Sequence, residues 1–512
     1  MAIDRIIIRS TPKIAPNKIA VRDTDDLTTE NGAPVFESDK TEEGNVSRSG
    51  TMSPIILIGS IRIPEQAIKS LTLFQDDLLP RVSITILDEG SVFGAGAYPI
   101  SNIIASIFIR SQNKKLKSVA GDYLITTVSS FAIPGTTSTV YTLGGELHVP
   151  KINGNFSKSF SKMTSLQALK SVADDLLLGF ADNQLDDTND KMTWLMPNYS
   201  YKSFINHVKK MAYRDDSNFF DCFIDRYYIL NFVNVEKMFS QDEEIDKGFM
   251  ALAQASIDKR RMTRGVEDED EDQSPEVELL LNNHASSKGS EFYISEFSLT
   301  SNHGEVLANH GLRKHAYWYD HGGNSDPNTV DSVNFINHFT EPLTTPTSND
   351  GLSPQTTAIT DFTKAESVGR IWNGIDYGNA HAYYKFANLI NRHNLLEIKK
   401  NQLKVSLPGL NSNIIRGSRV AIALYLNRMD SINAISARKE ATDQDKVTND
   451  GEASQPEKSN SGGSAQVYDK SLSGFYYVSS IKYSYIDGKF MTDMLLSRRH
   501  WLLPRPENKV LP

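Results

Sequence analysis

The 512-residue sequence has one cysteine, Cys222, and no long hydrophobic run. A single thiol excludes a disulfide framework and every metal site that needs several cysteines. The longest apolar stretches are short, such as Ile55–Ile58, whereas a membrane-spanning helix needs about 20 apolar residues. The N-terminal residues also lack the long apolar core of a signal peptide. We therefore expect a soluble protein that is made and used in a reducing cytoplasm.

Basic residues are fewer than acidic residues in this chain. Lys and Arg number 54 against 63 Asp and Glu, which gives a formal net charge of -9. This balance argues against a protein that holds nucleic acid through a dense phosphate-neutralising surface. Hydrophobic residues make up 39% and charged residues 23% of the chain, which is typical of a globular protein. The length allows about two to four domains with ample buried core.

Signatures of common enzymes are missing as well. The chain has no G-x-x-x-x-G-K-[ST] phosphate loop, no H-E-x-x-H, no G-x-S-x-G elbow and no EF-hand loop. Cys222 lies in the aromatic segment Phe219–Phe223, where a buried, inert thiol is expected rather than a nucleophile. No pair of carboxylates can be assigned acid and base roles from their spacing. We predict no catalytic residue, no cofactor and no enzymatic activity.

Four histidines, His303, His310, His315 and His321, form the most tempting metal-binding cluster, and Asp320 lies beside them. Imidazole is a common zinc ligand. Their spacings of seven, five and six residues fit neither one face of a helix nor a known zinc finger. The sequence therefore favours histidines that pack in a core or an interface, and it leaves metal binding open without predicting a site.

The first half of the chain divides into three parts. Residues 1–53 are mostly polar and form an N-terminal arm, in which Ile6–Ile8 could dock as an edge strand. Residues 54–150 alternate with period two and carry turn signals, which predicts a first small β-barrel. The strands expected there lie near residues 82–87, 103–109, 121–128 and 139–143.

Residues 151–240 change to a mixed pattern, which predicts an inserted α/β domain. Apolar residues at spacings of three and four predict a helix over Ser165–Leu177 behind Thr164 or Ser165, and a second over Phe204–Ala212. The second helix is expected to begin after Ser200 or Ser203. Residues 219–235 are aromatic and β-branched and predict two strands that turn near Asp225 and Arg226.

The second half is interrupted by polar tracts. Residues 241–290 form a charged linker with the acidic run Glu267–Asp272, which cannot pack. Residues 291–400 extend the second half, with a polar insertion at 322–363 and a helix at 382–391. Residues 401–505 predict a second β-barrel with a disordered insertion at 427–471. Its expected strands are 402–407 and 418–424, followed by a hairpin over 475–496 that turns at Asp487 and Gly488.

An internal repeat relates the two barrels. Gly121, Tyr123, Ile125 and Val128 follow the same G-x-Y-x-[IV]-x-x-[VI] pattern as Gly474, Tyr476, Val478 and Ile481. In each copy a β-branched strand precedes the pattern, and a turn and a second strand follow it. We therefore predict an α+β, β-rich fold in which one barrel type is used twice, with the mixed domain between the copies and long polar loop insertions.

The middle of the chain resembles the baseplate hub subunit of contractile-tailed bacteriophages and the hub portion of type VI secretion spikes. The resemblance is carried by residues 165–176, Trp194, the helix near 204–213 and the aromatic segment 216–235. The resemblance implies two tube-type β-barrels with an inserted domain. It also implies a homotrimer whose six barrels join a six-fold tail tube to a three-fold spike. The spike, the tube and neighbouring baseplate proteins would be its partners, and DNA would pass through its lumen during ejection.

The chain differs from a simple hub in its polar insertions and in lacking an evident lysozyme or spike domain, so any cell-wall-degrading activity would belong to a partner. The expected location is the tail baseplate of the virion, after assembly in the host cytoplasm and without insertion into a membrane. Two alternatives stay open. One is a tail-associated peptidoglycan hydrolase, against which the missing motifs count. The other is a host-surface-binding tail protein whose insertions at 322–363 and 427–471 recognise a glycan.

Overall fold

The computed structural model describes residues 6–14, 53–59, 61–89, 102–109, 119–183, 187–215, 218–239, 278–281, 293–301, 313–319, 330–336, 384–399, 401–412, 414–424, 474–486 and 488–498, with His381 and Leu472. The acidic run 267–272, the insertion 427–471, most of the insertion 322–363, and His303, His310 and His321 lie outside these residues.

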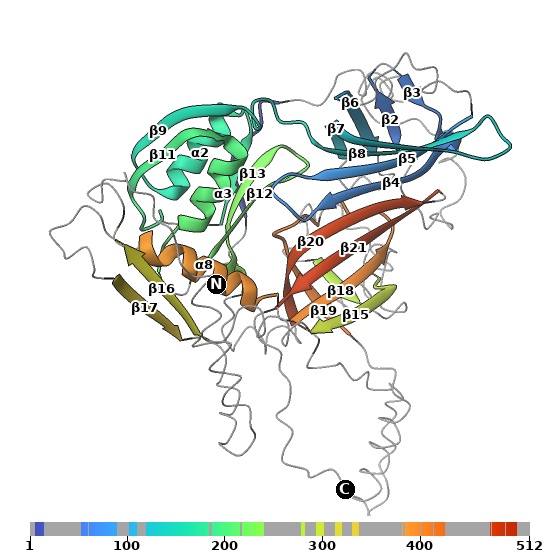
Figure 1. Ribbon diagram of the computed structural model, residues 1–512. Coiled ribbons are helices and arrows are strands. Elements are labelled where there is room, and N and C mark those ends of the chain that lie inside the picture. The colour runs from blue at the N-terminus through green and yellow to red at the C-terminus, as the bar shows by residue number, and fades with distance from the viewer. Residues whose placement is uncertain are drawn as a thin grey trace, which may run out of the picture.

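Thirteen strands form one continuous sheet, which runs through the right-hand side of Figure 1. Its first sheet half comprises β2 (Ile55–Ile58), β3 (Ile61–Ile63), β4 (Ile68–Gln75), β5 (Arg81–Asp88), β6 (Ile104–Ile109), β7 (Val119–Ala132) and β8 (Thr139–Leu147). A 3-10 turn, Glu65–Ala67, precedes β4. Its second sheet half comprises β14 (Glu278–Leu281), β15 (Glu296–Ser301), β18 (Asn401–Pro408), β19 (Arg419–Ala423), β20 (Gly474–Ile486) and β21 (Lys489–Ser497).

The strand order is β15-β18-β21-β20-β4-β5-β8-β7-β6-β2-β3, and the pair β14-β19 branches from β20. Alternation places the core side chains. In β5, for example, Val82, Ile84 and Ile86 are buried, and the residues between them are partly exposed. The sheet is open in the described residues. The structure therefore confirms a β-rich α+β protein, but it joins the two halves in one sheet where the sequence predicted two β-barrel domains.

The two sheet halves follow the same path. β7 and β8 form a hairpin with a register skip between Ile125 and Thr127, and β20 and β21 form one with a skip between Val478 and Ser480. Beyond these bulges, Val128 lies opposite Leu143 and Ile481 lies opposite Met494. Because a bulge shifts all later pairs by one residue, its recurrence at the same position of the repeat is a strong sign that the halves are equivalent.

The flanking strands correspond too. Gly121 and Tyr123 pair with Ile107 and Ala105 of β6, as Gly474 and Tyr476 pair with Ile422 and Val420 of β19. On the other side of each hairpin, β5 and β18 pair with β8 and β21, and β4 and β15 pair in turn with β5 and β18. The strand β15 of the second sheet half is therefore equivalent to β4 of the first.

The α/β unit lies against one side of this sheet. It contains β1 (Ile7–Ser10), β9 (Asn155–Met163), α2 (Ser165–Asp175), β10 (Gly179–Asp182), β11 (Met192–Ser200), α3 (Tyr201–Met211), β12 (Phe220–Ile224), β13 (Ile229–Asn234) and α4 (Val235–Phe239). Strands β1, β10, β13 and β12 form a four-stranded sheet, and β9 pairs with β11. The remaining elements are the hairpin β16 (Arg313–Tyr319) with β17 (Val330–Ile336), and α8 (Tyr384–Glu397), which packs on α3.

Both helices of the α/β unit begin where the sequence predicts. Thr164 caps α2 in a capping box, since its hydroxyl accepts from the Gln167 amide and the Gln167 side chain accepts from the Thr164 amide. Ser200 caps α3. The predicted edge strand near Ile6–Ile8 is also confirmed, because β1 pairs antiparallel with β10 and Arg9 forms an ion pair with Asp182 at 3.0 Å. The helix predicted at 382–391 is longer, ending at Glu397.

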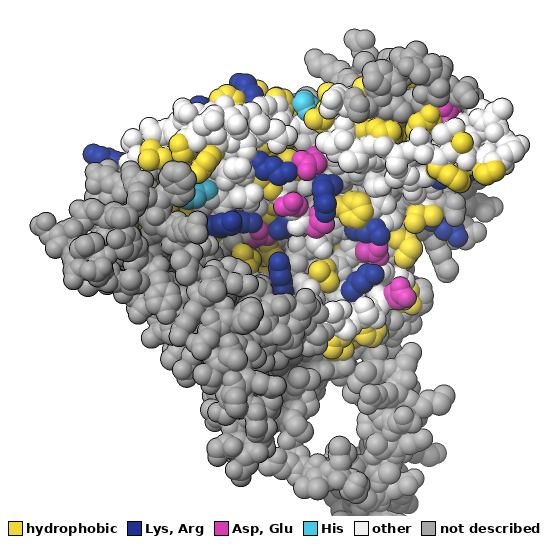
Figure 2. Space-filling model, viewed as in Figure 1, with side chains coloured by type: hydrophobic (Ala, Val, Ile, Leu, Met, Phe, Trp, Pro, Cys, Tyr) yellow, Lys and Arg dark blue, Asp and Glu magenta, His cyan; other side chains and the backbone are white. Residues whose placement is uncertain are grey.

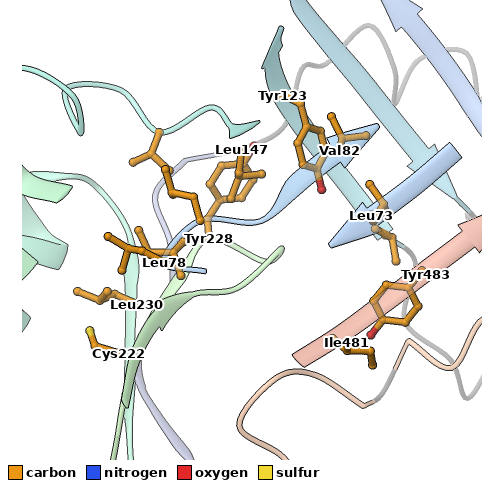
Figure 3. Close-up of a cluster of buried hydrophobic side chains, with 14 of the residues drawn as sticks. Leu73, Leu78, Val82, Tyr123, Leu147, Cys222, Tyr228, Leu230, Ile481 and Tyr483 are labelled. Atoms are coloured by element: carbon orange, nitrogen blue, oxygen red, sulfur yellow. The ribbon is translucent and has the colours of Figure 1, made fainter. Parts of the chain in front are cut away.

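The three regions share one hydrophobic core. Figure 3 shows Leu73 and Tyr123 from the first sheet half, Tyr228 and Leu230 from the α/β unit, and Tyr483 from the second sheet half in one cluster. These side chains are almost completely buried. Among the helices of the described part, none is long and apolar enough to cross a membrane.

Candidate assembly interface

A joint between β4 and β20 connects the two sheet halves. The strands are antiparallel, and Ile481, Tyr483 and Tyr485 lie opposite Gln75, Leu73 and Leu71. All six side chains are buried. Their packing adds apolar burial to the backbone hydrogen bonds of the sheet, and pairs of aromatic and aliphatic residues across strands contribute about 0.2–1 kcal/mol each. The joint shows that one edge of the first sheet half is complementary to one edge of the second.

Tyr483 also anchors the joint to the α/β unit through Arg226. The guanidinium of Arg226 lies 4.5 Å from the centre of the Tyr483 ring and 5.0 Å from that of Tyr227, and it donates to the carbonyl of Ser412. The Tyr483 hydroxyl donates to the Ile414 carbonyl at 2.5 Å. A cation held between two aromatic rings is stabilised by both, so this contact fixes the turn between β12 and β13 on the second sheet half.

A buried charge cluster makes a second contact between the α/β unit and the second sheet half. The Asp221 carboxylate of β12 accepts from Arg416 at 2.8 Å and from the Tyr477 hydroxyl at 3.2 Å, and Lys209 of α3 lies 3.5 Å away. Arg416 also donates to the backbone carbonyl of Asp77, between β4 and β5, at 2.7 Å. The cluster therefore ties both sheet halves to the α/β unit. On the surface shown in Figure 2, acidic and basic side chains are interspersed in the middle of the visible face.

The ionisation of these groups follows from their surroundings. Burial alone would raise the pKa of Asp221, but the charges of Arg416 and Lys209 and the hydrogen bond from Arg416 lower that pKa to about 2. Burial raises the pKa of the neighbouring Cys222 thiol to about 12, so this thiol stays protonated. The Asp221 carboxylate is ionised and holds the cluster together, and Cys222 is buried, as the sequence predicted.

The second half of β7, Thr127–Ala132, has an open edge. Its first half pairs with β6 on one side, but the last backbone hydrogen bonds on that side are those of Ile125 with Ile103 and Asn102, and among the residues that the structure describes no strand continues the pairing. Val128 and Phe131 on this segment are 40% and 61% exposed. We call this segment the β7 edge. Figure 1 shows the β7–β8 hairpin reaching away from the rest of the sheet, and Figure 2 shows hydrophobic side chains on the surface there.

A second open edge lies at the far end of the sheet, on β15. This strand pairs with β18 on one side only within the described part of the chain. Phe297 and Leu299 are 44% and 51% exposed, although both occupy positions whose equivalents in β4, Leu71 and Leu73, are buried in the joint. We call Glu296–Ser301 the β15 edge.

The described residues contain no cluster of metal-binding side chains. No group of three or more His, Cys, Asp or Glu side chains in the described part lies close enough to hold a metal ion. Of the four histidines that the sequence singled out, His315 lies on β16, and the other three fall outside the described residues. The histidine that the structure places in a core is His381. It contacts the rings of Trp194, Tyr213 and Tyr384, and burial lowers its pKa to about 4.

No model of a protein family matches the chain, and neither does any curated protein sequence. Among solved structures, a tail protein from Neisseria meningitidis MC58 is 9% identical with a TM-score of 0.44, covering 88% of this chain and 97% of its own. The 43 kDa tail protein of prophage MuSo2 from Shewanella oneidensis is 7% identical with a TM-score of 0.44, covering 87% of this chain and 98% of its own.

A third similar structure is the Escherichia coli c3393 protein, a component of the type VI secretion system with structural similarity to the bacteriophage T4 tail proteins gp27 and gp5. It is 8% identical with a TM-score of 0.36, covering 88% of this chain and 79% of its own. Likenesses at this level do not establish a shared fold. What the chain can do is therefore argued below from its own strand pairing.

Proposed function

We propose that this chain is the central baseplate hub of a contractile phage tail, a structural protein that forms a trimeric ring between tail tube and spike. The observation that carries the proposal is the joint between β4 and β20. It pairs two equivalent sheet halves side by side within one chain, and it leaves a matching edge of each half open. Three such chains provide six near-equivalent sheet halves, and a closed cyclic arrangement can use both of these matching edges in each chain.

This arrangement gives the proposed function its geometry. A ring that is three-fold by chain and nearly six-fold by sheet half can bind a six-fold tube on one side and a three-fold spike on the other. The partners are then the tail tube protein, the spike protein and neighbouring baseplate proteins. DNA passes through the lumen during ejection, and a net charge of -9 per chain disfavours retention of a polyanion on the wall. The ring belongs to the virion tail and assembles in the host cytoplasm.

Light scattering on the purified chain tests the proposal. We expect a particle of three times the chain mass of 57.1 kDa, at high protein concentration or with the spike partner added. Immunogold labelling of intact tails should place the protein on the tail axis. A strict monomer in the presence of the spike protein would contradict the hub, and labelling on peripheral fibres would favour a host-surface-binding protein. Release of soluble fragments from purified cell walls would favour the hydrolase.

A further inference from the structure

The joint between β4 and β20 is a template for a contact between chains. In it, the part of β20 that follows the bulge, Ile481–Ile486, pairs with β4 on the same side on which the first part of β20 pairs with β19. The equivalent part of β7 begins at Val128. It lies beyond β6 as Ile481–Ile486 lies beyond β19, but in the described residues it has no strand in the place of β4.

The β15 edge supplies the missing strand type. In the first sheet half, Ile84 of β5 lies between Leu71 of β4 and Leu143 of β8. In the second sheet half, Val405 of β18 lies in the same way between Phe297 of β15 and Met494 of β21. Phe297 is therefore the equivalent of Leu71, and Leu299 that of Leu73. Within the described part of one chain these two edges are not paired with each other.

We infer that the β7 edge of one chain pairs antiparallel with the β15 edge of a second copy, in the register of the internal joint. This inference rests on the proposed three-chain ring and specifies its contact. The register follows from the internal joint when each residue of β20 and β4 is replaced by its equivalent in β7 and β15. It pairs Val128 with Ser301, Ser129 with Thr300, Ser130 with Leu299, Phe131 with Ser298 and Ala132 with Phe297 of the neighbouring chain.

The side chains suit this register. Residues that lie opposite one another in an antiparallel pair point to the same face of the sheet. The exposed Leu299 and Phe297 of one chain therefore lie beside the small side chains of Ser130 and Ala132 of the next. In the joint the sizes are reversed, since Tyr483 and Tyr485 of β20 lie beside Leu73 and Leu71 of β4. Both pairs combine large with smaller side chains and place apolar surface on the core face.

The paired positions of the two edges lack the features that keep edge strands apart. Isolated edges commonly carry charged residues, especially Lys, or Pro, which prevent pairing with other chains. The β7 edge contains no charged residue and no proline, and the one charged residue of the β15 edge, Glu296, precedes the five positions that pair in the inferred register. Two unprotected edges with exposed aromatic side chains would be an aggregation hazard in a free chain. They are explained if each is covered by the other in a closed ring, which ends the pairing after three chains.

Engineered disulfides test the register. In Ser129→Cys with Thr300→Cys, the two thiols face each other between chains, and oxidation should give covalent dimers and trimers on a non-reducing gel. The matched positive control is Phe74→Cys with Lys482→Cys, which occupy the equivalent positions of the internal joint and should link within one chain. The register control is Ser129→Cys with Leu299→Cys, whose side chains point to opposite faces. The native Cys222 is buried and does not interfere.

The outcomes separate the register from the ring. If light scattering shows a trimer but Ser129→Cys with Thr300→Cys links no better than the register control, the pairing is wrong and the ring stands. If the chain does not form a trimer under any condition of that test, both fail. Links between chains in the in-register variant, at least about tenfold in excess of the register control, support the pairing.

A charge on the β15 edge provides an independent test. Because Leu299 is exposed in the single chain, Leu299→Lys should leave its thermal midpoint unchanged, but it buries a lysine in the ring and should raise the concentration needed for assembly at least about tenfold. Tyr199→Lys on β11 is the control, since Tyr199 is also exposed but lies away from both edges. Assembly of Leu299→Lys at the concentration of Tyr199→Lys would overturn the inference.

Discussion

The two sheet halves share a strand path, a repeat and a bulge, yet they end differently. In the second half, the part of β20 beyond the bulge is covered by β4 and anchored by Arg226, and its tyrosines are buried. In the first half, the equivalent part of β7 is exposed and carries Ser130 and Ala132 where β20 has Tyr483 and Tyr485. The same backbone arrangement is completed within the chain at one site and left open at the other. The difference separates what folds the chain from what assembles it.

The largest loss in the free energy of unfolding should come from breaking the buried charge cluster of Asp221, which holds the two sheet halves and the α/β unit together. Asp221→Ala leaves Arg416 buried without its carboxylate, and removal of one partner of a buried pair costs about 3–5 kcal/mol. Urea unfolding measures this loss. The control is Arg81→Ala, since the ion pair of Arg81 with Asp76 is exposed and should contribute less than about 1 kcal/mol.

The pH dependence of this loss has a defined sign. The pKa of Asp221 is lower in the folded chain, about 2, than in an unfolded one, about 3.9. Its ionisation therefore stabilises the fold above about pH 4, and this contribution is lost as the pH falls towards 2. The difference between wild type and Asp221→Asn should shrink over that window. A difference that does not change with pH would show that the carboxylate is not the stabilising group.

The repeat itself is tested by Tyr123→Ala and Tyr476→Ala. Both side chains are buried, one in each sheet half, and the Tyr476 hydroxyl donates to the Leu472 carbonyl at 2.6 Å. Each truncation should lower the free energy of unfolding by about 3 kcal/mol, at the lower end of the range for large aromatic core residues. Chemical denaturation of the two variants compares the halves directly. Retention of full stability by either would show that the tyrosine is not a shared core residue.

His381 gives a somewhat smaller effect in the α/β region. Its pKa is about 4 in the fold and about 6.5 when unfolded, so the unfolded chain binds the additional proton. Stability is therefore complete above about pH 6.5 and falls as the pH drops to 4, by roughly 2–3 kcal/mol. His381→Gln should flatten this dependence. An unchanged pH profile in the variant would assign the loss to other groups.

The smallest effect is expected from the polar insertions. Their compositions cannot repay the ordering entropy of a packed core, so deletion of Glu267–Asp272 or of residues 427–471 should shift the thermal midpoint by no more than about a few degrees, the effect of about 1 kcal/mol. Differential scanning fluorimetry measures it. A larger fall would mean that the insertion packs on the fold. We expect residues 427–471 to contact neighbouring tail proteins instead.

The sequence predicted those elements whose signals are local. The hairpins β7–β8 and β20–β21 each combine alternation with a short turn, and both were predicted together with their repeat. The helices α2 and α3 follow from apolar spacing and from the caps Thr164 and Ser200. The strands β12 and β13 follow from their dense aromatic and β-branched residues, with the turn at Asp225 and Arg226.

The joint and the edges were missed for a physical reason. The sequence analysis identified neither β4 nor β15. In β4 a register skip between Ile68 and Ser70 interrupts the alternation, and in β15 the alternating Phe297 and Leu299 stand between polar residues in a short strand. The pairing of β4 with β20 joins strands far apart in the chain through backbone hydrogen bonds. Because backbone groups are nearly the same for all residue types, the sequence does not show which strands pair. The contact of Asp221 with Arg416, 195 residues away, is equally invisible before folding.

The most direct test of the account is a reconstruction of the assembled particle by electron microscopy without imposed symmetry. The account predicts three chains around a central hole and six similar sheet segments. Three joints between β4 and β20 should alternate with three contacts between the β7 edge and the β15 edge of neighbouring chains. A ring of any other number of chains, or three chains joined through other surfaces with both edges exposed to solvent, would contradict it.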